Sequence, residues 1–162
     1  NLDVCPGGVN DVLAEALGLT EVSVLNPTGT DARGRPYGLI RTGMVREQRL
    51  AEFAAFVKSA LPCPGLRFAD AGKPVRRVAV GGGSCGGAID DVLAAGCDTL
   101  VTADLKYNHF EEAKYRGLNL IDAGHFETEN PVCAVLERVV REALPELTVL
   151  RAKAHKDETQ FL

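Results

Sequence analysis

The sequence predicts a layered α/β fold, because short apolar runs alternate along the chain with helical patterns. Three runs carry this prediction, Val75–Val80, Thr99–Thr102 and Leu118–Ile121, and a helical pattern separates each from the next. Strand–helix–strand connections of this length form right-handed parallel crossovers. We therefore expect these three strands to lie in one sheet that is flanked by helices.

The elements before Val75 follow from the same rules. A short strand is expected at Leu2–Val4, since the breaker cluster Pro6-Gly7-Gly8 follows it. Apolar residues at helical spacing predict one helix over residues 9–17 and another over Arg46–Leu61, which Pro62 ends. The other segments expected here are strands at Val22–Leu25, Tyr37–Arg41 and Leu66–Phe68, and a loop at Asn26–Pro36.

After Val75, the clearest helix is Val132–Ala143, whose apolar residues recur with a helical period. Asn130 is expected to cap it, with Pro131 at the first helical position, where the missing N–H does no harm. The remaining expected elements are helices at Ala88–Ala95 and Phe110–Tyr115, a strand at Leu147–Leu150, and a polar tail at Arg151–Leu162.

Length and composition restrict the classes of function. The 162 residues are enough for one core, so residues 1–162 are expected to form one domain. The net charge of −4 includes no basic cluster that fits a nucleic acid, and no run reaches the ~18 apolar residues of a membrane span. Five cysteines without Cys-x-x-Cys spacing argue against a disulfide framework and favour a cytoplasmic protein. The start at Asn1-Leu2-Asp3, without methionine, leads us to expect a further upstream segment.

The most informative segment begins where an apolar run ends in Gly124, because His125, Glu127 and Glu129 follow within five positions. Imidazole and carboxylate are ligands of zinc, manganese and iron, although a polar turn without function needs similar residues. Since Pro131 cannot lie deep inside a helix begun at His125, we expect a turn that joins His125 to Glu129 and leaves Glu127 facing solvent.

A glycine loop, Gly81–Gly87, follows one strand and precedes a helix. It matches G-x-G-x-x-G, and Asp104 ends the next strand roughly 20 residues later, as in dinucleotide-binding folds. Such folds need two units of this kind, and the sequence has one. We expect a structural turn that binds no dinucleotide, with Asp104 pointing toward the cleft or capping the next segment; a nucleotide-binding module is the alternative.

A second polar cluster follows Asp104. Lys106 could hold an anion there, and His109 could act as a general base, whereas a solvated helix start would explain the same residues.

Several blocks then occur in a characteristic order. They are Asn1-Leu2-Asp3 with Pro6-Gly7-Gly8-Val9-Asn10-Asp11, Gly81-Gly82-Gly83-Ser84, Asp104-Leu105-Lys106-Tyr107, and Gly124-His125-Phe126-Glu127-Thr128-Glu129. In combination they closely resemble the Nif-three-like dinuclear-metal family, whose members are often labelled GTP cyclohydrolase type 2. The resemblance spans nearly the whole chain. It implies an α/β fold of two interlocked lobes, a homohexamer, and two divalent transition metal ions per subunit.

By position, Asp3 corresponds to a metal-binding carboxylate, and His125 and Glu129 match the family's G-H-x-x-x-E block. The resemblance thus implies metal ligands at Asp3, His125 and Glu129, with His125 and Glu129 as catalytic residues. It also implies a metal-dependent hydrolase that acts on a purine nucleotide or related ring. A non-catalytic regulatory or scaffold protein would need the same residues.

The chain departs from the family pattern in three ways. No histidine pair precedes Asp3, so three ligands cannot close two metal sites without water or other donors. Asn108 stands where many members carry a histidine, with His109 one place later. The inserted domain of some members is also absent.

Overall fold

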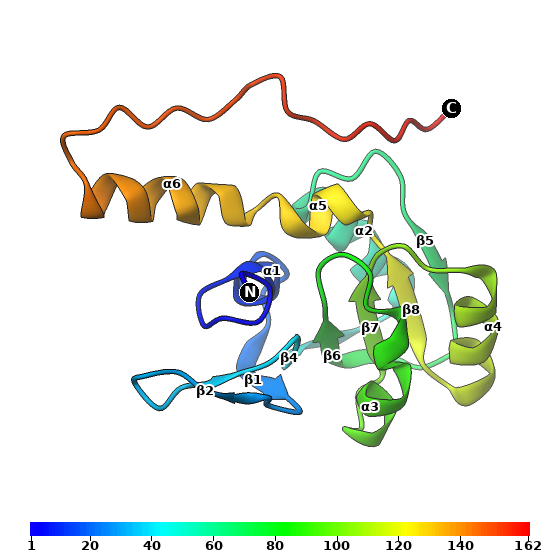
Figure 1. Cartoon of the computed structure of the whole chain (residues 1–162). Coiled ribbons are helices and arrows are strands. Elements are labelled where there is room, and N and C mark those ends of the chain that lie inside the picture. The colour runs from blue at the N-terminus through cyan, green and yellow to red at the C-terminus, as the bar shows by residue number, and fades with distance from the viewer.

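A six-stranded mixed sheet forms the centre of the molecule, with the strand order β1-β4-β6-β7-β8-β5 (Figure 1). The structure is a computed structural model and describes residues 1–162. As predicted, the three central strands are parallel: β6 (Val75–Val80), β7 (Thr99–Thr102) and β8 (Asn119–Asp122). The outer strands pair antiparallel; they are β1 (Thr20–Leu25), β4 (Ile40–Gln48) and β5 (Arg67–Ala69).

Helices cover both faces of this sheet and create two cores. Neighbouring residues of β6 divide between them: Val78 and Val80 belong to the core that contains Leu13 and Phe53, and Ala79 belongs to the other. This alternation is what a strand buried on both faces requires. The covering helices are α1 (Val9–Ala16) and α2 (Leu50–Ala60) on the first face, and α3 (Ile89–Ala94) and α4 (Tyr107–Arg116) on the second.

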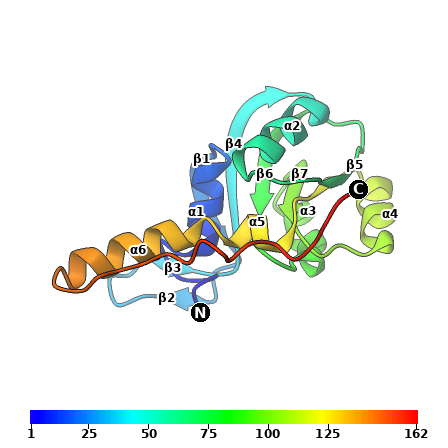
Figure 2. The same cartoon turned by 90° about the horizontal axis from the view of Figure 1, so that it is seen from above.

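The chain then leaves the sheet through two consecutive helices, α5 (His125–Glu129) and α6 (Val132–Ala143). The turn expected to join His125 to Glu129 is the short helix α5, which ends at Glu129, before Pro131 would have to supply an N–H. The predicted cap is displaced by one residue, since Pro131 itself is the cap of α6. In Figures 1 and 2, α6 extends away from the sheet and the C-terminal tail runs back alongside it.

Two predicted strands are absent. Leu2–Val4 lies in a series of turns and pairs with no strand: the Cys5 N–H donates to Asn1 O over 3.2 Å, and the Val9 N–H donates to Leu2 O over 3.1 Å. Leu147–Leu150 also has no strand partner. Its alternating apolar residues lie beside α6, far from the sheet edges (Figure 1).

Two boundaries in the first half also differ from prediction. The strand expected at Tyr37–Arg41 begins only at Ile40, as β4, and continues to Gln48, so α2 begins at Leu50 instead of Arg46. The loop expected at Asn26–Pro36 contains a small hairpin of β2 (Gly29–Thr30) and β3 (Pro36–Tyr37). No helix in the structure combines the length and the apolar character needed to cross a membrane.

Candidate functional site

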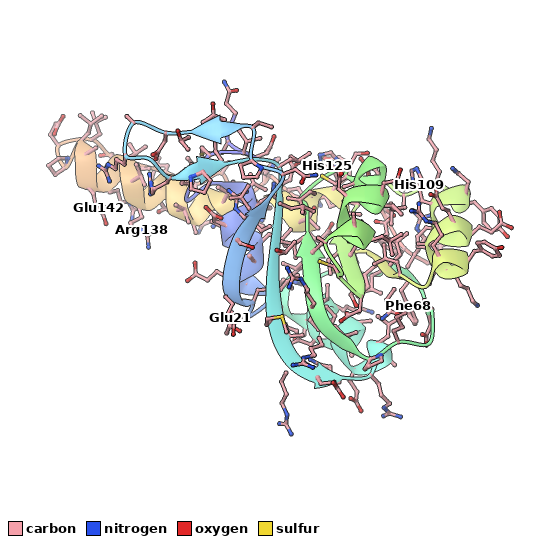
Figure 3. All side chains as sticks on the ribbon, turned by 90° about the horizontal axis from the view of Figure 1, so that it is seen from below. Glu21, Phe68, His109, His125, Arg138 and Glu142 are labelled. Carbon is pink, nitrogen blue, oxygen red and sulfur yellow. The ribbon has the colours of Figure 1, made fainter.

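His125 lies at the carboxyl end of β8, where α5 begins (Figure 3). Its Nδ1 is 2.7 Å from Asp104 Oδ2 and its Nε2 is 3.2 Å from Glu129 Oε1, so the imidazole lies between two carboxylates. The hydrogen bond with Asp104 is the main cause of a raised His125 pKa, and the charge of Glu129 raises it further. The imidazole is therefore more readily protonated than an isolated histidine.

The helix α5 brings His125 and Glu129 together, because residues four apart share one helix face. The same helix turns Glu127 inward. We expected Glu127 to face solvent, and this was wrong: only 7% of the residue is exposed. Burial raises the pKa of the Glu127 carboxyl, and the nearby Asp157 carboxylate raises it further.

Asp3 shares a pocket of about 580 Å³ with His125 and Glu129, which lies between the N-terminal turns, α5 and α6, and the C-terminal tail. Of the three residues, His125 and Glu129 are in contact. No group of three or more histidine, cysteine, aspartate or glutamate side chains is gathered closely enough to hold a metal ion. The structure thus places the three predicted residues around one pocket without assembling a closed site.

Two residues that the sequence analysis did not identify fix the segment that carries Asp3. Asn10 is completely buried; its amide donates to Asp3 O over 2.9 Å and to Leu39 O over 2.6 Å, while its Oδ1 accepts the Gly82 N–H over 2.6 Å. Arg41 is also buried, pairs with Asp11, and donates to Val4 O over 3.3 Å. The Asn10 side chain therefore links the Asp3 segment to the glycine loop.

The glycine loop directs its backbone donors inward. Besides Gly82, the Gly83 N–H donates to Thr128 Oγ1 and the Cys85 N–H donates to Thr102 Oγ1, both over 3.0 Å. These donors are already occupied and do not point at an open phosphate position. A short 3₁₀ turn, Gly86–Ala88, precedes α3. This geometry favours a structural turn over a phosphate cradle.

Gly83 has a second role, because it allows the loop to approach the candidate ligands. Its φ of +62° lies in the left-handed region, and a Cβ at this position would lie 2.4 Å from Glu129 Oε1 and 3.1 Å from His125 Nε2. A residue with a side chain would displace Glu129. The glycine run identified in the sequence therefore forms one wall of the His125–Glu129 site.

The second polar cluster divides in the structure. Asp104 belongs to the site, since it contacts His125. His109 instead accepts the Lys106 N–H over 3.2 Å and so stabilises the first turn of α4, and Lys106 is exposed. His109 and His125 come from different helices (Figure 3). The helix-start interpretation thus explains Lys106 and His109.

The side chains of Asp3, His125 and Glu129 are of the types that bind transition metals. Two donors that bind one ion at about 2.0–2.2 Å, with tetrahedral or octahedral angles, lie roughly 2.8–3.6 Å apart. The 3.2 Å between His125 Nε2 and Glu129 Oε1 falls within this interval. In number the set is incomplete, so water or donors beyond these residues would have to complete the coordination.

Comparisons with known proteins identify relatives over nearly the whole chain. The family profile of Duf34/NIF3 (NGG1p interacting factor 3) matches residues 1–158. A GTP cyclohydrolase 1 type 2 homolog from Nostoc sp. is 39% identical over 145 residues, which is 87% of this chain and 53% of the relative. Another from Streptomyces coelicolor is 41% identical over 138 residues, or 82% of this chain and 48% of the relative. The chain thus spans about half the length of these curated relatives.

Solved structures give the same fold. A Staphylococcus aureus hypothetical protein superposes with a TM-score of 0.87 at 26% identity, covering 99% of this chain and 66% of that one. A Bacillus cereus protein related to NIF3 superposes with a TM-score of 0.88 at 23% identity, covering 99% of this chain and 71% of that one. At 23% identity, the match to the Bacillus cereus protein supports a similarity of fold alone.

Proposed function

Since the chain belongs to the Duf34/NIF3 family, we propose that it binds a divalent transition metal through Asp3, His125 and Glu129. The observation that carries this proposal is the contact of His125 Nε2 with Glu129 Oε1, 3.2 Å apart, in the pocket that Asp3 also lines. One imidazole and two carboxylates fit zinc, manganese or iron. A second metal ion in each subunit would need donors beyond these three residues.

We further propose that the protein is a metal-dependent hydrolase, with His125 and Glu129 as its catalytic residues. A bound metal with open positions can activate water or polarise a carbonyl or phosphoryl group. His125 and Glu129 would hold it, since their Nε2 and Oε1 atoms lie 3.2 Å apart. The pocket beside them, about 580 Å³, has room for a small ligand.

A purine nucleotide or related ring is the substrate class that we propose. Support comes from the relatives' name, GTP cyclohydrolase 1 type 2 homolog. The test is turnover of GTP by metal-loaded protein, followed by loss of the purine absorbance, with His125→Ala as the control. Metal-dependent turnover that the control lacks would support the hydrolase. Metal binding without turnover on any purine nucleotide would support the alternative, a metal-binding regulatory or scaffold protein.

A nucleotide-binding module built on Gly81–Gly87 is the weaker candidate, because side chains already occupy the N–H groups of Gly82, Gly83 and Cys85. Micromolar binding of a nicotinamide or flavin cofactor to metal-free protein, measured by titration calorimetry, would favour the nucleotide-binding module instead.

We propose that the chain assembles into a homo-oligomer, by family resemblance a hexamer. Exposed apolar side chains on α6, including Leu136 and Val139, support an interface. We also propose a cytoplasmic location, since all five cysteines are free thiols.

A further inference from the structure

We infer that Asp104 is a positioning residue, which holds His125 in the tautomer and orientation that turn its Nε2 toward Glu129. The inference rests on the proposed function, because it assigns Nε2 as the metal-binding atom. Its first support is the 2.7 Å hydrogen bond between His125 Nδ1 and Asp104 Oδ2. An ionised carboxylate can only accept, so Nδ1 must carry the hydrogen.

The hydrogen bond at Nδ1 determines the state of Nε2, the other nitrogen of the imidazole. With the hydrogen on Nδ1, the Nε2 atom of a neutral ring presents a lone pair, and Glu129 Oε1 lies 3.2 Å from it. Two electron-rich atoms at this separation attract a cation between them. In metalloproteins a histidine ligand commonly donates its other N–H to such a carboxylate, which fixes the ring.

The backbone of Asp104 provides a second, independent support. Its φ is +54°, a left-handed conformation that is uncommon for a residue with a side chain. The residues on both sides hold it there: the Ala103 N–H donates to Gly83 O over 2.9 Å, and the Leu105 N–H donates to Asp122 Oδ2 over 3.0 Å. Unusual backbone conformations of this kind concentrate at functional sites.

Solvent exposure separates positioning from a purely structural role. The side chains of Asp104 and His125 are each 51% exposed. Ion pairs this exposed contribute little to folding stability. Loss of the pair should therefore change the behaviour of His125 much more than the free energy of unfolding.

The test combines two measurements on Asp104→Gly. Glycine adopts a φ of +54° without strain, so the variant removes the carboxylate and preserves the backbone. The tautomer of His125 is read from imidazole ¹⁵N shifts of metal-free protein at pH 9, and Co²⁺ affinity is measured by titration. The control is Asp90→Asn. Asp90 lies on α3 and pairs with Arg116 on α4, so this variant also removes an exposed carboxylate from an ion pair.

In the native protein we expect the Nδ1–H tautomer. In Asp104→Gly we expect a mixture of tautomers and a Co²⁺ affinity about 10–100-fold weaker; Asp90→Asn should match the native protein in both. An Nε2–H tautomer in the native protein overturns the inference without any variant. Unchanged tautomer and Co²⁺ affinity in Asp104→Gly, with Co²⁺ binding lost in His125→Ala, overturns it and leaves the metal site standing. Unchanged Co²⁺ affinity in both variants overturns the metal site as well.

Discussion

His125 acquires its special environment from residues distant in sequence. Asp104 comes from the end of β7, Glu129 from the next turn of α5, and Gly83 from the loop after β6. Parallel strands bring these segments to one edge of the sheet, where α/β proteins place their ligands. Each segment could be identified from the sequence. The left-handed conformation of Asp104, which bonds to His125, could not, because no sequence pattern indicated it.

Cys63 permits a test of burial at the scale of one residue. It is 5% exposed and its thiol donates to Ala123 O over 3.2 Å. Burial is the main cause that raises the pKa of this thiol from 9.0 to about 11. The folded protein therefore retains the proton more tightly than the unfolded chain. The stabilisation is complete below pH 9 and is lost as the pH rises through 11.

We predict that the free energy of unfolding of the native protein falls, relative to that of Cys63→Ala, by about 2 kcal/mol between pH 8 and pH 11. The alanine leaves a cavity, but that penalty does not depend on pH and so cancels from the slope. Urea unfolding followed by circular dichroism at several pH values measures both proteins. If the free energies of unfolding of both proteins changed in parallel with pH, burial would not raise the pKa of the Cys63 thiol.

At the scale of elements, prediction succeeded where the local pattern and the tertiary position agree. The central strands β6 and β7 have the predicted ends, because both are rich in β-branched residues and their last residues are buried. Leu147–Leu150 has a similar pattern but no free sheet edge beside it. The length of β4 was underestimated. Arg46 and Glu47, near its end, are charged and exposed, so they do not look like strand residues in the sequence.

Some candidate site residues could be recognised from local sequence, whereas others could not. His125 and Glu129 could be found from the sequence because they lie four positions apart in one segment, directly after a predicted strand. Asn10 and Arg41 could not, since their roles rest on hydrogen bonds to backbone atoms of other segments, such as Gly82 and Val4. Buried polar side chains of this kind look like surface residues until the fold is known.

The packing of α2 gives an element-scale prediction. Phe53 is fully buried in the core, whereas Phe56, three residues later, is 44% exposed. Phe53→Ala should lower the free energy of unfolding by about 3–5 kcal/mol, because it removes a large side chain and leaves a cavity. Phe56→Ala, the matched control on the same helix, should cost much less. Urea unfolding compares the two, and equal losses would contradict the assigned face of α2.

For the whole molecule, the extended α6 has a consequence for assembly. Leu136, Val139 and Val140 are each more than a third exposed on a helix that projects from the sheet (Figure 2). We predict a homo-oligomer, hexameric by family resemblance, in which such side chains are covered. Light scattering coupled to size exclusion should give the mass of several chains, and Val139→Glu should reduce it. A monodisperse monomer at high protein concentration would argue against the assembly.

The proposed metal site depends on His125. His125 contributes little to the core, so His125→Ala should fold normally but lose most of its bound zinc, manganese or iron. His109→Ala is the matched control, because that imidazole stabilises the first turn of α4 away from the proposed ligands. The decisive measurement is metal content per chain, by plasma mass spectrometry, of the native protein and both variants. We expect metal in the native protein and in His109→Ala, and little in His125→Ala. Unchanged metal content in His125→Ala, with the fold intact by circular dichroism, would show that His125 does not bind the metal.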